Sequence, residues 1–221
     1  MYLITLSGFR FADRICFFTT LMISSILGHE LDKPLSWLIK KTVLERIHPT
    51  ALTLTGLLVN FFAAAAIIAG YWKSAALLIL IAGLFDMLDG ATARTFRKTS
   101  SFGGFLDSVI DRYSDMSLLI GLIIYYALQG KIFMVSLCSI ASLGTVLIPY
   151  SRAKAEAFIP QCSVGIMERA ERILLLAAGT LFNIMDIVMW LLAIFTHLTV
   201  FHRIYYTWKE MQKLQKDTMQ T

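Results

Sequence analysis

The sequence FDMLDGATARTFRKTSSFGGFLDSVID, residues 85–111, places four aspartates between two long apolar segments. The acidic residues are Asp86, Asp89, Asp107 and Asp111. Carboxylates at the edge of a bilayer are costly to desolvate and usually serve a function. We therefore expect this acidic stretch to be the active site of a membrane protein.

The composition of the whole chain is typical of an integral membrane protein. Hydrophobic residues make up 57% of the 221 residues, charged residues only 16%, and the mean hydropathy is +0.68. A soluble domain carries about 25% charged residues. The net charge of +5 comes from basic residues at the ends of apolar segments, which favours lipid headgroups and phosphate substrates over nucleic acid. The three scattered cysteines show no spacing for a zinc site or a disulfide framework.

The apolar segments predict an all-α membrane fold. We expect six transmembrane helices preceded by an N-terminal interfacial helix, which residues 34–47 would form by alternating apolar and basic side chains. Residues 15–27 are apolar but short, so both a span and a surface-lying segment stay open. The expected spans cover residues 50–71, 74 into the acidic stretch, 102–128, 132–150, 173–182 and 184–205. The expected organisation is an N-terminal extension at 1–33, a membrane domain at 34–209 and a cytoplasmic tail at 210–221.

The distribution of basic residues predicts the orientation. With six spans and an inner N-terminus, the outer connections hold only Lys73 and Lys131, and the inner segments hold all the other loop lysines and arginines. This asymmetry follows the positive-inside rule. We expect an integral protein of a prokaryotic inner membrane whose acidic stretch faces the cytoplasm.

The spacing of the acids predicts that they converge. Asp86 and Asp89 share one helical face, and Asp107 and Asp111 share another, because residues three or four apart are neighbours on a helix. The connection between the two segments would set these faces against each other. Four converging carboxylates would repel one another without a cation, and oxygen ligands suit Mg²⁺ or Mn²⁺. The roles of Asp115 and Asp186 stay open, although a single aspartate near a membrane helix end is usually an ordinary interfacial residue.

The order D-x2-D-G-x2-A-R-x8-G-x3-D-x3-D resembles the signature of the CDP-alcohol phosphatidyltransferases. Every position is matched: Asp86, Asp89, Gly90, Ala93, Arg94, Gly103, Asp107 and Asp111. The resemblance implies transfer of a phosphatidyl group from CDP-diacylglycerol to a small alcohol, with release of CMP. It also implies two metal ions held by Asp86, Asp89 and Asp107 with a contribution from Asp111, which would in addition be the general base. A homodimer is implied by the same resemblance.

The resemblance implies a nucleotide site as well. Gly90, Arg94, Ser100 and Gly103 match family positions near the nucleotide or its diphosphate. The start of the first span, Pro49, Thr50, Ala51 and Leu52, matches a nucleotide-contacting segment. Thr50 replaces the asparagine that is usual there, and a plain helix N-cap is an alternative role for it.

Basic motifs downstream resemble the phosphatidylinositol phosphate synthase branch, which uses inositol 1-phosphate as acceptor. By that likeness Arg152, Lys154 and Arg172 would bind the acceptor phosphate, with Arg112 and Arg169 as further candidates. Glycerol 3-phosphate carries the same charge, so phosphatidylglycerophosphate synthesis is the alternative. A membrane cation channel or transporter is an alternative of another class, but it would spread acids through the bilayer depth, whereas these acids lie within about two helical turns of one side.

Overall fold

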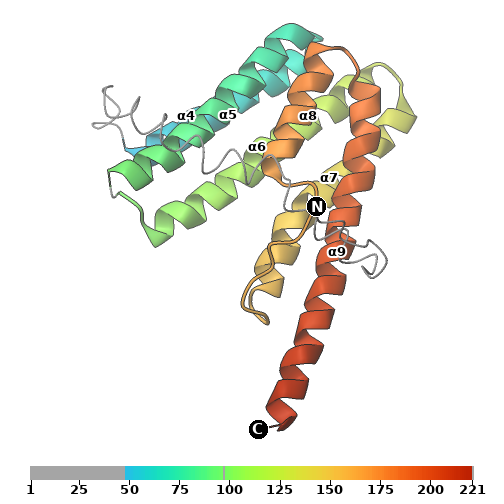
Figure 1. Ribbon diagram of the computed structural model, residues 1–221. Coiled ribbons are helices and arrows are strands. Elements are labelled where there is room, and N and C mark those ends of the chain that lie inside the picture. The colour runs from blue at the N-terminus through green and yellow to red at the C-terminus, as the bar shows by residue number, and fades with distance from the viewer. Residues whose placement is uncertain (1–47, 97, 221) are drawn as a thin grey trace, which may run out of the picture.

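The structure is a computed structural model that describes residues 48–96 and 98–220. This part of the chain contains helices and no strand (Figure 1). The predicted extension and interfacial helix, residues 1–47, lie outside the described residues. The helices are α4 (Pro49–Ile68), α5 (Trp72–Thr95), α6 (Ser101–Leu128), α7 (Ile132–Ala155), α8 (Arg169–Leu181) and α9 (Met185–Gln220).

Four of these helices, α4, α5, α7 and α9, are long and apolar enough to cross a membrane. Helix α6 has 28 residues, but it carries Asp107, Asp111 and Arg112 in its first half and Asp115 directly after it. Helix α8 has 13 residues, which reach about 20 Å against a hydrocarbon core of about 30 Å. The all-α membrane fold is thus confirmed for the described residues, and the number of six spans stays a prediction.

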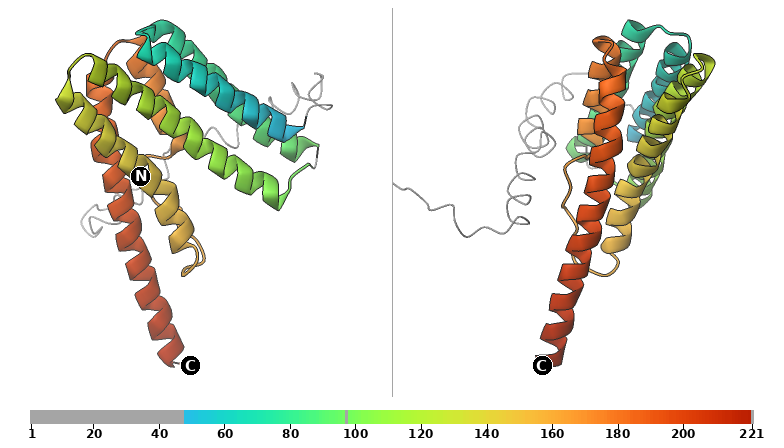
Figure 2. Two further views of the ribbon diagram at one scale, coloured as in Figure 1. Left: turned by 180° about the vertical axis from the view of Figure 1, so that it is seen from behind. Right: turned by 90° about the vertical axis from the view of Figure 1, so that its right-hand side faces the viewer.

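Two groups of helices make up the bundle. Helix α4 packs against both α5 and α6, α7 packs against α9 and α6, and α8 lies against α5 and α9 (Figures 1 and 2). A tight turn at Gly70, whose φ of 78° suits glycine, reverses the chain between α4 and α5. As a result, the beginning of α4, the end of α5 and the beginning of α6 meet at one end of their group.

Small residues let neighbouring helices approach closely. A Cβ atom added at Gly121 of α6 would lie 3.0 Å from the Ala64 carbonyl oxygen of α4. One added at Gly144 of α7 would lie 2.1 Å from Thr196 Oγ1 of α9. Such contacts are typical of membrane bundles, where close packing takes over much of the role that the hydrophobic effect has in water.

Helices α7 and α9 extend further than the apolar pattern predicts. Helix α7 continues through Pro149 to Ala155, and α9 continues through the polar segment beyond residue 209 to Gln220 (Figure 2). The reason is that glutamine, lysine, glutamate, leucine and methionine are good helix formers even where they no longer contact lipid. An ion pair of 2.5 Å between Lys213 and Glu210 lies in this extension.

Candidate active site

The end of α5 and the beginning of α6 bring three carboxylates together. Asp86 and Asp89 come from α5 and Asp107 comes from α6. One oxygen of each lies within 4.8 Å of the other two. The helical spacing and the short connection between the helices produce this convergence.

The three carboxylates fit a divalent cation. Asp89 Oδ2 and Asp107 Oδ1 are buried and accept no hydrogen bond. Leaving a carboxylate oxygen desolvated without a partner is costly, whereas a bound cation would satisfy it. A cluster of carboxylate oxygens suits Mg²⁺ or Mn²⁺, and such an ion, when bound, neutralises a diphosphate and stabilises a leaving phosphate.

Asp111 lies on the other side of the cluster, against an arginine. Arg169, the first residue of α8, places Nη1 2.9 Å from Asp111 Oδ1 and 2.5 Å from Asp86 Oδ2. The sequence-based expectation that only a bound cation would offset the repulsion among the four acids is therefore wrong for Asp86 and Asp111, which have Arg169 as a counter-charge. Spacing within α5 and α6 could not reveal the contact, because Arg169 arrives from a helix far along the chain.

A second arginine of α8 continues this row of ion pairs. Arg172 Nη2 donates to Asp115 Oδ2 at 2.6 Å, and Arg169 Nε lies 3.5 Å from Asp115 Oδ1. Asp115 is buried and ion-paired, so of the roles left open for it the ordinary interfacial one is wrong. Asp186 is different, since it accepts a 2.8 Å hydrogen bond from Tyr126 at the other end of the bundle.

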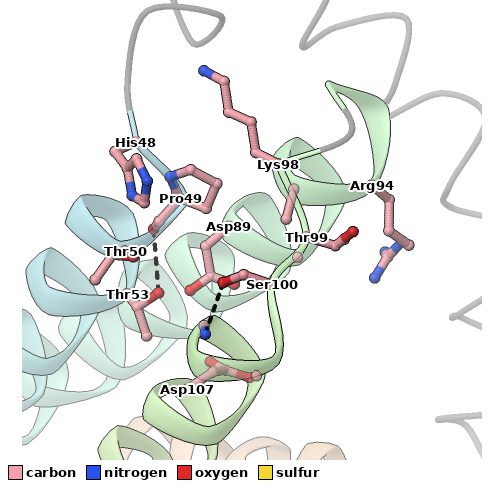
Figure 3. A pocket seen from close by; sticks show the side chains of 14 residues that line it. His48, Pro49, Thr50, Thr53, Asp89, Arg94, Lys98, Thr99, Ser100 and Asp107 are labelled. Carbon is pink, nitrogen blue, oxygen red and sulfur yellow. Dashed lines mark hydrogen bonds between the residues drawn. The ribbon is translucent and has the colours of Figure 1, made fainter.

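A pocket of about 240 Å³ opens beside the carboxylates (Figure 3). Ala51 and Leu52, both predicted nucleotide contacts, do not line it. Six predicted nucleotide residues do: Pro49, Thr50, Gly90, Arg94, Ser100 and Gly103. Five further residues, which are neither in the acidic signature nor among the predicted nucleotide contacts, also line the pocket: His48, Thr53, Lys98, Thr99 and Gly104. Thr53 could have been found, because it follows Pro49 by four residues and so shares its helical face.

Two residues that line this pocket are helix N-caps, and a third is a glycine beside Arg94. Helix α4 begins at Pro49 with His48 as its N-cap, so the alternative that Thr50 is the cap is wrong. Ser100 is the N-cap of α6, and its Oγ accepts from the Gly103 backbone N–H at 2.9 Å (Figure 3). A Cβ atom at Gly90 would lie 3.3 Å from Arg94 Nη1, so a side chain there would crowd that guanidinium.

The other predicted acceptor residues have partners of their own. Arg152 Nε lies 3.0 Å from Glu156 Oε1 just beyond α7, and this hydrogen bond holds the pKa of Glu156 below its usual range. Lys154 lies over the Phe158 ring. Arg112 Nη1 donates to the Ser108 carbonyl oxygen at 2.5 Å. Of the five predicted acceptor residues, Arg169 contacts Asp86 and Asp111, Arg112 Nη1 also lies 3.6 Å from Asp111 Oδ2, and Arg172 contacts Asp115.

One buried arginine was assigned no role in the sequence analysis. Arg203 of α9, whose side chain is 2% exposed, donates from Nε to the Val164 carbonyl oxygen at 2.8 Å and from Nη1 to that of Ile148. These bonds tie the segment before α8 to the end of α7. Arg203 thereby helps to fix the position from which α8, with Arg169 and Arg172, begins.

A model of the CDP-alcohol phosphatidyltransferase family matches residues 46–201, which is most of the chain. The chain therefore belongs to this family and is a membrane-embedded CDP-alcohol phosphatidyltransferase, as the acidic signature implied.

The named relatives of this chain include archaetidylinositol phosphate synthases and a phosphatidylinositol phosphate synthase. The archaetidylinositol phosphate synthase of Pyrococcus horikoshii is 33% identical over 83% of this chain and 95% of its own length. The corresponding synthase of Methanothermobacter thermautotrophicus is 36% identical over 73% of this chain and 83% of its own length. The crystal structure of Mycobacterium tuberculosis phosphatidylinositol phosphate synthase with CDP-DAG bound matches with a TM-score of 0.71 and 26% identity, over 80% of this chain and 93% of that one. Another crystal structure of that enzyme is a complex with manganese and citrate.

Proposed function

We propose that this enzyme transfers the phosphatidyl group of CDP-diacylglycerol to inositol 1-phosphate and releases CMP. The observation that carries the proposal is a pair of arginines on α8: Arg169 contacts Asp86 and Asp111, and Arg172 contacts Asp115 on the next turn of α6. A phosphorylated acceptor needs fixed positive charge, and guanidinium groups bind phosphate through paired N–H groups. The inositol phosphate synthases among the relatives support this choice of acceptor.

The carboxylates divide into two roles in this proposal. Asp86, Asp89 and Asp107 would hold two divalent ions, with Asp111 at the edge of that site. Asp111 acts as the general base and takes the proton of the acceptor hydroxyl as its oxygen bonds to the lipid-linked phosphorus. The bond from that phosphorus to the CMP oxygen breaks, and CMP leaves with its electron pair.

The donor would use two neighbouring cavities. The pocket near Arg94 and Lys98 offers positive charge for the diphosphate beside the start of α4. A second cavity of about 510 Å³ lies between α5 and α8 and includes Asp86 and Arg169 among its lining residues. Its other walls are mainly apolar, formed by residues such as Leu80, Leu84, Met87, Ile173 and Leu174. These surfaces suit the nucleotide and the acyl chains of one lipid.

We further propose how the enzyme sits in its membrane. Six spans with the acids on the cytoplasmic side of a prokaryotic inner membrane agree with the distribution of lysine and arginine. CDP-diacylglycerol would then enter from the bilayer and the phosphorylated alcohol from the cytoplasm. A homodimer is proposed from the family resemblance alone.

An acceptor panel tests the proposed function. Purified enzyme would receive CDP-diacylglycerol, Mg²⁺ and one acceptor at a time: inositol 1-phosphate, glycerol 3-phosphate or free inositol. We expect CMP release to be fastest with inositol 1-phosphate. Turnover with glycerol 3-phosphate alone would assign the enzyme to phosphatidylglycerophosphate synthesis, and a preference for free inositol would contradict the role of the arginine pair.

A further inference from the structure

Asp115 is a buried carboxylate that the proposed reaction does not use. It follows Asp107 and Asp111 on α6 at intervals of four residues, so the three acids form one row along the helix. Asp107 lies in the acidic cluster and Asp111 contacts Arg169, whereas Asp115 lies one turn further along α6. Its side chain is only 10% exposed.

Asp115 contacts both arginines of the proposed acceptor site. Its Oδ2 accepts from Arg172 Nη2 at 2.6 Å, and its Oδ1 lies 3.5 Å from Arg169 Nε. Arg172 is 4% exposed, and its Nη1 also donates to the Met167 carbonyl oxygen at 3.2 Å. Asp115 therefore pairs with Arg172 and also contacts Arg169 at Nε, whereas Nη1 of Arg169 contacts Asp86 and Asp111.

The two guanidinium groups still have hydrogen-bonding capacity. Nε of Arg172 is buried and donates no hydrogen bond, whereas Nε of Arg169, which donates none either, faces Asp115 Oδ1 at 3.5 Å. Because a buried donor without a partner is costly, the Nε–H group of Arg172 indicates a ligand that offers an acceptor oxygen. A phosphate group offers such oxygens together with the negative charge that arginine requires.

The negative charge of Asp115 also offsets the electrostatic attraction of Arg169 to the other acids. Arg169 contacts Asp86 and Asp111, which belong to the proposed metal and base positions. Without the charge of Asp115, those two carboxylates would be the acidic partners left to Arg169. The guanidinium would then be drawn further onto the catalytic acids and away from an incoming phosphate.

We propose that Asp115 is a positioning residue, which holds Arg169 and Arg172 where they receive the acceptor phosphate and so determines the affinity for the acceptor. The inference rests on the proposed function, since it assumes a phosphorylated acceptor. It differs from a purely structural role because α8 packs mainly against α5 and α9. The contacts of Asp115 reach from α6 to the two side chains that would bind substrate.

The test replaces Asp115 by asparagine, which keeps the shape and removes the charge. We expect the acceptor KM to rise roughly tenfold or more while the KM for CDP-diacylglycerol changes by less than about twofold. Calorimetric titration of inositol 1-phosphate into the enzyme without donor lipid should show a similar loss of affinity. Asp115→Glu keeps the charge but displaces it, so its acceptor KM should lie between those of the native enzyme and Asp115→Asn.

Asp186→Asn is the matched control, because it neutralises an aspartate that accepts a hydrogen bond far from the site. Both KM values should stay at the native level in this variant. Equal rises in both KM values for Asp115→Asn, or a lower melting temperature with unchanged acceptor affinity, would overturn the inference. If Asp115→Asn does not fold, Asp115→Glu decides alone: a rise confined to the acceptor KM supports the inference, and any other pattern contradicts it.

A second variant separates this inference from the proposed function. Arg172→Gln should raise the acceptor KM if the arginine binds the acceptor phosphate. An unchanged acceptor KM in Arg172→Gln would refute the proposed acceptor site itself. A raised KM in Arg172→Gln with a native value in Asp115→Asn would leave the proposed function intact and refute only the role of Asp115.

Discussion

At the scale of single residues, four signature aspartates of one motif occupy two environments. Asp86, Asp89 and Asp107 form the compact cluster that fits a cation. Asp111 is 14% exposed and lies against Arg169. Asp86 belongs to both environments, since it also contacts Arg169. The same residue type can thus serve as ligand and as base, because its neighbours differ.

Asp111→Asn should abolish turnover and leave the binding of CDP-diacylglycerol largely intact. A general base acts mainly in the transition state, whereas a metal ligand also supports the bound donor. Asp89→Asn, the matched substitution in the cluster, should weaken the binding of both Mn²⁺ and the donor. Donor binding measured by titration, together with CMP release, would check this. Lost donor binding with a native kcat in Asp111→Asn would show that the roles are assigned wrongly.

Arg169→Ala should strengthen the binding of Mn²⁺ while weakening that of the acceptor. The guanidinium neutralises Asp86 and Asp111, so its removal takes away a competing cation. A gain of about 1 kcal/mol would correspond to several-fold tighter binding. Electron paramagnetic resonance of added Mn²⁺, without substrates, would measure it. Arg152→Ala, which removes an arginine paired with Glu156, is the control. Weaker Mn²⁺ binding in Arg169→Ala alone would contradict this account.

At the scale of elements, the sequence predicts those features of the helices that depend on the local spacing of residues. Asp86 and Asp89 share a face near the end of α5, and Asp107 and Asp111 share a face near the beginning of α6. Both pairs follow from spacings of three and four residues. The contact between Arg169 and Asp111 does not, because it depends on where α8 lies relative to α6. The start of α8 was also hard to predict, since its first turn holds Arg169, Glu171 and Arg172 and does not resemble a membrane segment. Those charges are accommodated by partners elsewhere in the chain, which a local pattern cannot show.

The close approach of α7 and α9 should make Gly144 intolerant of a side chain. A Cβ atom there would lie 2.1 Å from Thr196 Oγ1 and 2.7 Å from Thr196 Cβ, so a helix must move. Gly144→Ala should lower the free energy of unfolding by about 1–3 kcal/mol. Gly83→Ala is the control, because its added Cβ would make an ordinary contact of 3.7 Å with Ile173. Thermal unfolding in detergent would compare them, and equal melting temperatures would refute the packing argument.

At the scale of the whole molecule, the bundle concentrates its chemistry at one end. Three helix ends and the first turn of α8 supply the acids, the arginines and the pocket. The Tyr126–Asp186 contact and the turns at Gly70 and Gly130 belong to the other end. This polarity suits a reaction between a membrane lipid and a substrate dissolved on one side.

The proposed orientation can be tested by labelling from one side of the membrane. Gln129 lies in the turn after α6, and Lys216 lies near the far end of α9; both are exposed. In intact spheroplasts, an impermeant thiol reagent should modify Gln129→Cys and spare Lys216→Cys. Inverted vesicles should give the opposite pattern, with the native protein as the blank. Labelling of Lys216→Cys in spheroplasts would place the active site on the outer side.

Our central claim is that the aspartates and arginines of this site catalyse the transfer of the phosphatidyl group from CDP-diacylglycerol to a phosphorylated alcohol. The most direct measurement is mass spectrometry of the lipid formed when purified enzyme receives CDP-diacylglycerol, Mg²⁺ and equal concentrations of inositol 1-phosphate and free inositol. We expect phosphatidylinositol phosphate with one CMP per lipid, and no product when a chelator replaces Mg²⁺. Phosphatidylinositol as the main product, or undiminished synthesis in the chelator, would contradict the account.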